Sequence, residues 1–295
     1  MIEKLTYVND LGEQIVFSQN STYHVNFQDI TGLSDIRNTI FSVSGMGQDG
    51  DLFLGSRIDA REIDITGVIR ERKKDVVQVL RRTLTHVLNP KNTARLVYEC
   101  GEIKRVINCV TENAPVFKRQ PIFEQFSINL VCLNPFWSET TDIREDIALW
   151  RGSFEFPEPG GLELQDEVGW EIGYREPSLI VNVSNLGDVP SGMKIVFYAL
   201  GVVENPSLLN VKTGEFIKFN LSMDPGDVLS ITTGYGEKTV TLLRNHIESN
   251  AFRSLDVDST YIQLASGDNL FRYDADSDLK NLEIAIYHKN LYMGV

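Results

Sequence analysis

The run from Ile122 to Trp137 constrains this chain more than any other stretch. Apolar side chains fill every second position of its centre: Phe126, Ile128, Leu130 and Cys132. That period of two predicts a long β-strand with one buried face. Pro135 ends the strand, because proline has no N–H to donate to a neighbouring strand. We therefore expect a core strand that closes a first domain.

The two halves of the chain differ in charge. Its 295 residues, 42% of them hydrophobic, are enough to bury a core in each of two domains. Residues 1–150 carry 17 Lys and Arg against 20 Asp and Glu, whereas residues 151–295 carry 11 against 21. The second half thus holds −10 of the total net charge of −13. Nucleic acid requires a basic surface, so we expect no nucleic-acid specificity.

Residues 1–150 are predicted to form an α+β domain. Apolar residues recur at helical spacing between Lys74 and Leu88, which predicts one amphipathic helix. Pro90 ends it, because the residue before a proline is driven out of the helical conformation. Alternating runs on both sides of this helix predict strands. The expected architecture is an antiparallel sheet with one helix packed on it.

The remainder is predicted to be a connection followed by an all-β domain. Residues 151–177 are rich in Gly, Pro and acidic residues, so we interpret them as an interdomain connection. Residues 178–295 contain many short strands between turn signals, such as the Asp-Pro-Gly-Asp sequence at 224–227, and no helical period. This pattern is typical of a sandwich of antiparallel sheets. The sequence therefore predicts a mainly β protein that ends in a jelly-roll or lectin-like sandwich.

The three cysteines, Cys100, Cys109 and Cys132, lack the CxxC spacing of zinc and redox sites. Cys109 and Cys132 fall in predicted strands, so we expect reduced and mostly buried thiols, as in a protein folded in a reducing cytosol. The N-terminal residues show no signal-peptide pattern, and no apolar run approaches membrane-spanning length. We expect a soluble protein with no membrane insertion.

Two sequence patterns resemble ligand-binding motifs but lack the context that those motifs need. Gly45, Gly47 and Gly50 match the dinucleotide-binding fingerprint, yet no helix start follows them, so a plain glycine loop is the better interpretation. The acidic run at residues 274–278 has the DxDxD pattern of a calcium loop, but glycine and glutamate are absent from the sixth and twelfth positions. An acidic hairpin tip is expected there.

The sequence gives no support to an active site or a metal site. Glycosidase chemistry needs a carboxyl group with a raised pKa in a dry pocket, whereas the acidic residues of the connection are expected to be solvated. The histidines are scattered, with neither HxH nor HxxxH spacing. We therefore expect no catalytic residues, no metal and no cofactor. The residues considered are Glu155, Glu158, Glu163, Asp166 and Glu167, and His24, His86, His246 and His288.

A basic cluster surrounds the start of the predicted helix. It comprises Arg70, Arg72, Lys73, Lys74, Arg81 and Arg82. Positive charge at a helix N-terminus opposes the helix macrodipole, so this placement is locally unfavourable. The cluster is either a solvated helix face or a surface that binds an acidic protein partner.

Short motifs along nearly the whole chain carry a family resemblance. In the first domain they are Gly47-Gln48-Asp49-Gly50, Arg61-x-Ile63-x-Ile65, Leu88-Asn89-Pro90 and Asn134-Pro135-Phe136-Trp137. In the second they are Phe154-Glu155-Phe156-Pro157, Gly187-Asp188-Val189-Pro190-Ser191-Gly192, Asn210-x-x-Thr213-Gly214-Glu215, Asp227-Val228-Leu229-x-Ile231, Gly267-Asp268-Asn269-x-Phe271 and Tyr292-Met293-Gly294-Val295. By the order and spacing of these motifs, the chain resembles the distal tail protein (Dit) family of long-tailed, non-contractile phages and prophages.

The resemblance implies a structural protein, not an enzyme. Members of this family form a hexameric ring through an N-terminal domain that continues the tail tube, and they carry a galectin-like C-terminal sandwich at the periphery. The ring joins the tail tube protein to the tail-associated lysin or tip protein and, where present, to receptor-binding proteins. The resemblance thus implies a location at the tail tip or baseplate of the virion, after synthesis in the bacterial host cytoplasm.

A closed ring uses a heterologous interface, in which two different surfaces of one chain meet. Unpaired edge strands of the first domain are the contact surface that we expect for it.

The alternative is a carbohydrate-binding module that attaches to the host cell wall, because the second domain resembles a lectin sandwich. Sugar recognition usually needs an exposed aromatic platform. No tryptophan follows Trp170, and the galectin-type His-x-Asn-Pro-Arg run is absent. The remaining aromatic candidates, Tyr235, Phe252, Tyr261 and Tyr273, are more simply core or rim residues. A third interpretation, a wall hydrolase, predicts activity on peptidoglycan, which we do not expect.

Overall fold

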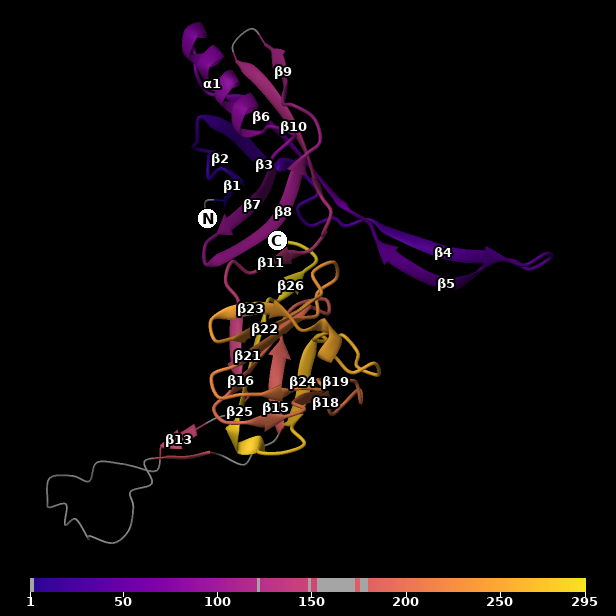
Figure 1. The fold of residues 1–295 in the computed structure, drawn as a ribbon. Coiled ribbons are helices and arrows are strands. Elements are labelled where there is room, and N and C mark those ends of the chain that lie inside the picture. Colours follow the sequence, from indigo (N-terminus) through magenta and orange to yellow (C-terminus); the bar gives the residue numbers. More distant parts are fainter. Residues whose placement is uncertain (1–2, 121–122, 148–149, 153–172, 176–179) are drawn as a thin grey trace, which may run out of the picture. The chain divides into compact units, whose positions relative to one another are not determined.

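The computed structural model describes residues 3–120, 123–147, 150–152, 173–175 and 180–295, which form two compact units (Figure 1). Unit 1 consists of Met1–Thr140 and Leu291–Val295, and unit 2 consists of Thr141–Asn290. The first unit therefore ends before residue 150 and takes in the segment at 291–295. The expected connection at 151–177 lies mostly outside the described residues. Near it, β13 (Trp150–Gly152) pairs with β14 (Gly173–Arg175).

The main sheet of unit 1 closes into a barrel. Its strands hydrogen-bond in the order β8-β7-β1-β2-β3-β6-β10, and β10 pairs again with β8 through Leu130↔Thr111 and Val131↔Val110. β9 extends the sheet from β10, and β11 and β26 extend it from β8. The short pairing of β2 with β3 is parallel. The bounds are β1 (Glu3–Asn9), β2 (Gln14–Ser18), β3 (Tyr23–Thr31), β6 (Arg61–Ile69), β7 (Thr93–Cys100), β8 (Ile103–Thr111), β9 (Val116–Arg119), β10 (Glu124–Cys132), β11 (Trp137–Ser138) and β26 (Leu291–Tyr292).

Barrel closure limits which strands of unit 1 can make the expected edge contact. Closing a sheet pairs strands that would otherwise be edges. Most strands of unit 1 therefore offer no unpaired edge. β9, β26 and a separate hairpin of β4 (Asn38–Ser44) with β5 (Asp51–Ile58) keep one. The mainly β class and the single helix of this unit are confirmed within the described residues.

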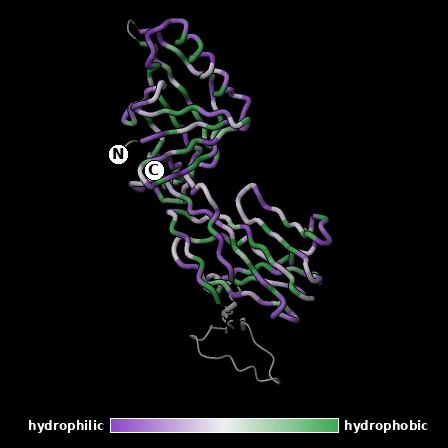
Figure 2. The backbone as a smooth tube through the Cα atoms, turned by 90° about the vertical axis from the view of Figure 1, so that its left-hand side faces the viewer, coloured by the Kyte–Doolittle hydropathy of each residue, from purple (hydrophilic) through white to green (hydrophobic). Residues whose placement is uncertain are grey.

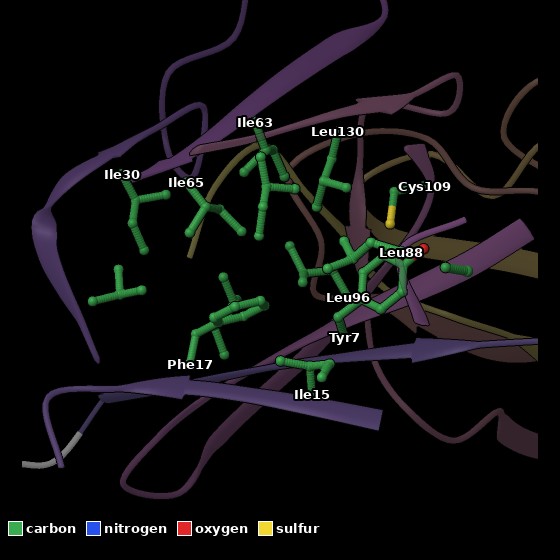
Figure 3. Packing of buried hydrophobic residues seen from close by; sticks show 14 of the residues in the cluster. Tyr7, Ile15, Phe17, Ile30, Ile63, Ile65, Leu88, Leu96, Cys109 and Leu130 are labelled. Atoms are coloured by element: carbon green, nitrogen blue, oxygen red, sulfur yellow. The ribbon is translucent and has the colours of Figure 1, made fainter. Parts of the chain in front are cut away.

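The barrel interior is the hydrophobic core of unit 1 (Figure 3). The predicted core strand is confirmed as β10, in which every second residue from Glu124 to Cys132 is buried. β6 alternates in the same way and pairs with β10 along its whole length. In Figure 3, Ile63 and Ile65 of β6 point toward Tyr7 and Phe17 from the opposite side of the barrel. Alternation thus places one face of each strand in a shared core.

The predicted helix is α1 (Lys74–Val87), which buries Leu84 and Val87 against the barrel. Two contacts fix it there. The Tyr23 hydroxyl donates to the Leu80 carbonyl at 2.9 Å, and the Asn9 side-chain amide donates to the Val87 carbonyl at 3.4 Å. The helix ends at Val87 with Leu88 as its C-cap, before Pro90 as the proline signal predicts.

Unit 2 is a β-sandwich. Its two larger sheets have the strand orders β12-β25-β16-β21-β22-β23 and β15-β24-β18-β19, and β17 pairs with β20. Residues of both sheets form one core, with Phe197 and Ile284 from the first and Val183 and Phe271 from the second. Hydrophobic and hydrophilic residues alternate along the strands of both units (Figure 2). The packing of two sheets around one core confirms the predicted sandwich.

The bounds of unit 2 are β12 (Ile143–Asp146), β15 (Ile180–Asn185), β16 (Met193–Ala199), β17 (Val203–Glu204), β18 (Ser207–Asn210), β19 (Phe216–Lys218), β20 (Ser222–Met223), β21 (Val228–Thr232), β22 (Thr239–Arg244), β23 (Ile247–Asn250), β24 (Gly267–Asp274) and β25 (Leu282–His288). Short 3₁₀ turns occupy Phe252–Ser254 and Leu279–Asn281. Among the described residues, none of the helices is long and apolar enough to span a membrane.

Candidate assembly surface

The hairpin of β4 and β5, residues 38–58, projects away from the barrel and is called the arm here (Figure 1). It forms a two-stranded sheet of its own. The glycine pattern at 45–50 lies in the loop between its strands and leads into β5 rather than into a helix. The interpretation of these glycines as a plain loop is therefore confirmed.

The arm carries apolar side chains that its own unit leaves exposed. They are Ile40, Phe41, Val43, Met46, Leu52, Phe53 and Leu54. Val43 is 50% exposed and Leu52 is 64% exposed. An isolated two-stranded hairpin is at best marginally stable in water, and clustered exposed apolar residues mark interaction sites. The arm thus has the properties of an element that becomes buried on assembly.

Strand register gives the arm two faces. Val43 pairs with Leu52, and Phe41 lies two residues from Val43 on the same strand, so these three side chains share one face. Ser42 lies on the opposite face and pairs there with Phe53, whose side chain is also exposed. Both faces of the arm thus expose apolar side chains.

A hydrogen-bond network closes the root of the arm. The backbone N–H of Asp59 donates to the Arg37 carbonyl at 3.0 Å. The Asp59 carboxylate accepts from the Thr39 hydroxyl at 2.5 Å and from the Arg57 guanidinium at 3.0 Å. The bond from Thr39, and then that from Arg57, hold the pKa of Asp59 below its usual value. The two strands are thus tied together where they leave the barrel.

Arg61 fixes the segment from which the arm emerges. Its side chain is only 2% exposed, and its guanidinium donates to the carbonyls of Gly32, Leu33 and Asp35 at 2.7, 3.0 and 3.3 Å. It also donates to the carbonyl of Pro135 at 2.7 Å and to that of Met293. Burial lowers the pKa of this guanidinium. Because a buried donor without a partner is costly, this set of carbonyls holds the residues before the arm in place.

The segment 291–295 completes this root. Tyr292 pairs with Trp137 in the sheet, and the guanidinium of Arg105 lies 3.7 Å from the centre of the Tyr292 ring. Arg105 also donates to the Gly294 carbonyl. The Ser34 hydroxyl donates to the Val295 carbonyl at 3.1 Å. Residues from the far end of the sequence thus contact the same turn that Arg61 holds.

The six residues of the basic cluster are in two kinds of environment. The Arg81 guanidinium pairs with the buried Glu124 carboxylate at 3.2 Å and lies 4.6 Å from the centre of the Phe117 ring. Arg70 donates to the Gln19 carbonyl at 2.7 Å. The other four members, Arg72, Lys73, Lys74 and Arg82, are exposed and form no ion pair among the described residues.

The Glu71 carboxylate accepts from the backbone N–H groups of Lys73 and Arg72, at 3.0 and 2.7 Å, which lowers the pKa of Glu71. The α1 N-terminus itself has no side-chain cap. The exposed cations therefore surround an uncapped helix start.

The remaining sequence candidates form no site among the described residues. No group of His, Cys, Asp and Glu there has the geometry of a metal site. Asp276, from the DxDxD run, accepts from Asn205 and Lys218 at 2.8 and 3.0 Å. The carboxylates considered at 155–167 lie outside the described residues. Cys109 and Cys132 are buried free thiols, as expected, and their proximity together with burial raises the pKa of Cys109.

The four aromatic candidates for sugar binding are in different environments. Tyr273 is buried in the core of unit 2. Tyr261 is half-buried, and the Lys238 ammonium lies 4.3 Å from the centre of its ring. Tyr235 and Phe252 are exposed. The structure thus removes Tyr273 from the candidate platforms.

Two family models match most of the chain. Residues 12–132 match the "Phage tail protein RIFT-related domain", and residues 186–291 match the "Siphovirus-type tail component, C-terminal domain". The first match lies in unit 1 and the second almost entirely in unit 2. Comparison with curated protein sequences gives no match.

Solved structures resemble the whole chain in fold. The crystal structure of the Dit protein (gp 19.1) of phage SPP1, described as a paradigm of hub adsorption apparatus in phages that infect Gram-positive bacteria, aligns with a TM-score of 0.69 at 13% identity. The alignment covers 97% of this chain and 98% of that one. A chain of the phage p2 baseplate in its activated conformation with Ca aligns with a TM-score of 0.54 at 12% identity, over 100% of both chains. These similarities concern the fold.

Proposed function

We propose that this chain, which belongs to the siphovirus distal tail protein family, assembles into a hexameric ring that joins the tail tube to the tail tip. Membership of this family indicates a structural component of the virion tail. In the proposed ring, unit 1 forms the wall and unit 2, which we propose to be a galectin-like sandwich, lies at the periphery.

The arm is the observation that carries this proposal. Residues 38–58 place several large apolar side chains in water, outside any core of their own unit. Burying a large apolar side chain contributes about 1.5–3 kcal/mol, so a copy that covers the arm gains several such contributions. A projecting element that binds a different surface of the next copy gives a heterologous contact, which closes into a ring when its rotation fits.

We propose that the tail tube protein and the tail-associated lysin or tip protein bind the two faces of this ring, with receptor-binding proteins where they occur. The four exposed members of the basic cluster are the proposed contact for an acidic surface of one of these partners. Charges of opposite sign steer association and set specificity more than they set affinity. No step of this role requires a catalytic group or a cofactor.

The test is the mass of the purified full-length protein over a concentration series, measured by light scattering, with negative-stain images of the same samples. The proposal predicts a species of six times the 33.3 kDa chain mass and rings with a central hole. Replacing residues 38–58 by a short Gly-Ser linker should abolish the rings and leave a folded monomer. Addition of the tail tube protein tests whether assembly needs a template. A monomer at all concentrations, with or without tube, would overturn the proposal.

A further inference from the structure

Two cysteines lie opposite each other where the barrel of unit 1 closes. Val131 of β10 pairs with Val110 of β8 in an antiparallel register, and the next position along this register places Cys132 opposite Cys109. Cys109 is 4% exposed and Cys132 is 0% exposed, so both side chains face the interior. The register thus brings two thiols together inside the barrel.

The two thiols are close enough to interact. A hydrogen bond between them, together with burial, raises the pKa of the Cys109 thiol. Residues directly opposite each other in an antiparallel pair have Cα atoms about 4.5–5.5 Å apart. A disulfide bond needs a Cα separation of about 4.4–6.8 Å. The register therefore gives Cys109 and Cys132 the spacing that a disulfide needs, and both are free thiols in the structure.

An open groove gives one of these thiols a route to solvent. The groove has a volume of about 680 Å³ and lies where β1, β8 and β10 end and β7 begins. Cys109 lines it beside Val110 and Val131, whereas Cys132 is fully buried. A small reagent that enters the groove therefore meets Cys109 first.

We propose that Cys109 and Cys132 are a redox-sensitive pair, which stays reduced in the cytosol of the host and is oxidised to a disulfide outside it. Disulfides persist in oxidising surroundings and are rare in a reducing cytosol. The bond joins β8 to β10 at the seam where the barrel closes. This inference goes beyond the proposed ring and does not depend on it.

The oxidant is a small disulfide of the class of oxidised glutathione. The Cys109 thiolate attacks one sulfur of the reagent and releases the other half, which takes up the proton that Cys109 lost. The Cys132 thiolate then attacks the Cys109 sulfur and releases the second half, which takes up the proton of Cys132. Two protein thiols are thus oxidised to one disulfide, and the reagent is reduced to two thiols. Because the raised pKa of Cys109 leaves little thiolate, the first attack is slow.

The disulfide fastens a seam that few backbone pairs hold. β10 pairs with β6 along its whole length but with β8 through two residue pairs. A cross-link between β8 and β10 restricts the unfolded chain and so favours the folded state. We expect the oxidised protein to unfold at a midpoint about 5–10 °C above that of the reduced protein.

Thiol counting on the full-length protein tests the pair. The reduced protein is incubated with oxidised glutathione in mildly alkaline buffer, denatured with N-ethylmaleimide and analysed by intact mass spectrometry. The expected result is the loss of two of the three free thiols, and a digest without reductant that contains the linked Cys109 and Cys132 peptides. The same treatment in urea controls for the reagent, because the unfolded chain should also form disulfides with Cys100.

Cysteine variants separate the roles of the two thiols. Cys132→Ala should stop at a glutathione adduct on Cys109, because the second thiol is missing. Cys109→Ala should leave Cys132 free, because Cys132 is fully buried. Cys100→Ala is the matched control and should still form the disulfide. Circular dichroism verifies that each variant is folded.

The outcomes either support or overturn the proposal. Formation of the bond between Cys109 and Cys132, with a higher unfolding midpoint that dithiothreitol reverses, supports it. A folded protein that keeps three free thiols while the unfolded chain is oxidised overturns it, as does a disulfide that uses Cys100. A bond between Cys109 and Cys132 that leaves the midpoint unchanged overturns its role at the seam.

Discussion

The guanidinium of Arg61 donates a hydrogen bond to the main-chain carbonyl of Met293, although 232 positions separate the two residues. The same group holds the carbonyls of Gly32 and Leu33, from which the arm emerges. Arg61 therefore joins the start of β6, the base of the arm and a segment that follows the whole of unit 2. Together with the bonds of Asp59, this side chain fixes the base of the proposed assembly element.

Replacing Arg61 should lower stability strongly. Arg61→Met removes all the donors and leaves several buried carbonyls without partners, so we expect a loss on the order of 3 kcal/mol in the free energy of unfolding of unit 1. Arg61→Lys keeps the positive charge but not the planar guanidinium with its several N–H donors, so it should lose less stability than Arg61→Met. Urea unfolding, followed by a spectroscopic signal from unit 1, gives the free energy of unfolding of both variants. The matched control is Arg119→Met, at an exposed position of β9, which should change stability little. A loss for Arg61→Met as small as that of the control would contradict this role.

Removing residues 291–295 should loosen unit 1 without unfolding unit 2. The deletion removes the pairing of β26 with β11 and the partners of Arg105 and Ser34. Amide hydrogen exchange should then speed up in residues 32–37 and 103–107, because their local opening costs less free energy. The sandwich strands β16 and β25 should keep their protection. Unchanged exchange at residues 32–37 would show that residues 291–295 are not needed to hold the arm root.

A charge on the arm should prevent assembly. Val43→Asp puts a carboxylate beside Leu52 and should abolish oligomers, because a buried unpaired carboxylate is costly. Val257→Asp makes the same change at an exposed position of unit 2 and should leave assembly intact. Light scattering over a concentration series compares the two variants, with circular dichroism to verify folding. Equal effects of the two variants would contradict the role of the arm in assembly.

Acid should remove one surface contribution to the stability of unit 1. Glu99 pairs with Lys104 at 2.8 Å and with Lys4 at 3.0 Å, and these two cations hold its pKa below the usual value. A carboxyl group with a depressed pKa in the folded state stabilises above its unfolded pKa and loses that effect as the pH falls through the folded pKa. Glu99→Gln should therefore cost about 0.5 kcal/mol at pH 7, a value typical of exposed pairs.

The cost of Glu99→Gln should disappear well below pH 4, where Glu99 is protonated in the wild type as well. Urea unfolding at pH 7, 5 and 3 gives this series, with Glu102→Gln at an exposed position as the control. A cost that is constant across the series would exclude an ionic origin.

The full-length protein should show no competable binding to a glycan array. Tyr273 is buried, and the Lys238 ammonium lies 4.3 Å from the ring centre of the half-buried Tyr261, so one of the four aromatic candidates is closed to sugar and a second is partly covered. Substituting the exposed Tyr235 and Phe252 by alanine provides the control if a signal appears. Strong binding that free sugar competes and that these substitutions abolish would revive the carbohydrate-binding alternative.

Local sequence signals predicted the elements with one buried face. The alternation from Phe126 to Cys132 identified β10, and Pro90 marked the end of α1. Closure of the barrel was not predictable in this way, since it depends on two residue pairs that join β10 to β8. The role of Arg61 was not predictable either, because its partners are backbone carbonyls, which every residue type carries.

The arm was visible in the sequence only as two apolar runs beside a glycine loop. Local pattern does not distinguish strands of a core from strands that project into water, because both alternate in the same way. Val43 and Leu52 are exposed because β4 and β5 pair only with each other and not with the barrel. This pairing is a property of the tertiary structure. The basic cluster, by contrast, was found by charge, yet Arg81 turned out to pair with Glu124.

The position of residues 291–295 also sets an order of events during synthesis. Domains generally fold as units while the chain emerges from the ribosome, N-terminal first. Here the barrel strands emerge early, but Arg61 and Arg105 acquire their last partners only after the entire sandwich has been translated. We expect nascent chains and prematurely terminated chains to have an unfinished arm root. Completion of the arm root thus waits for translation of the second unit.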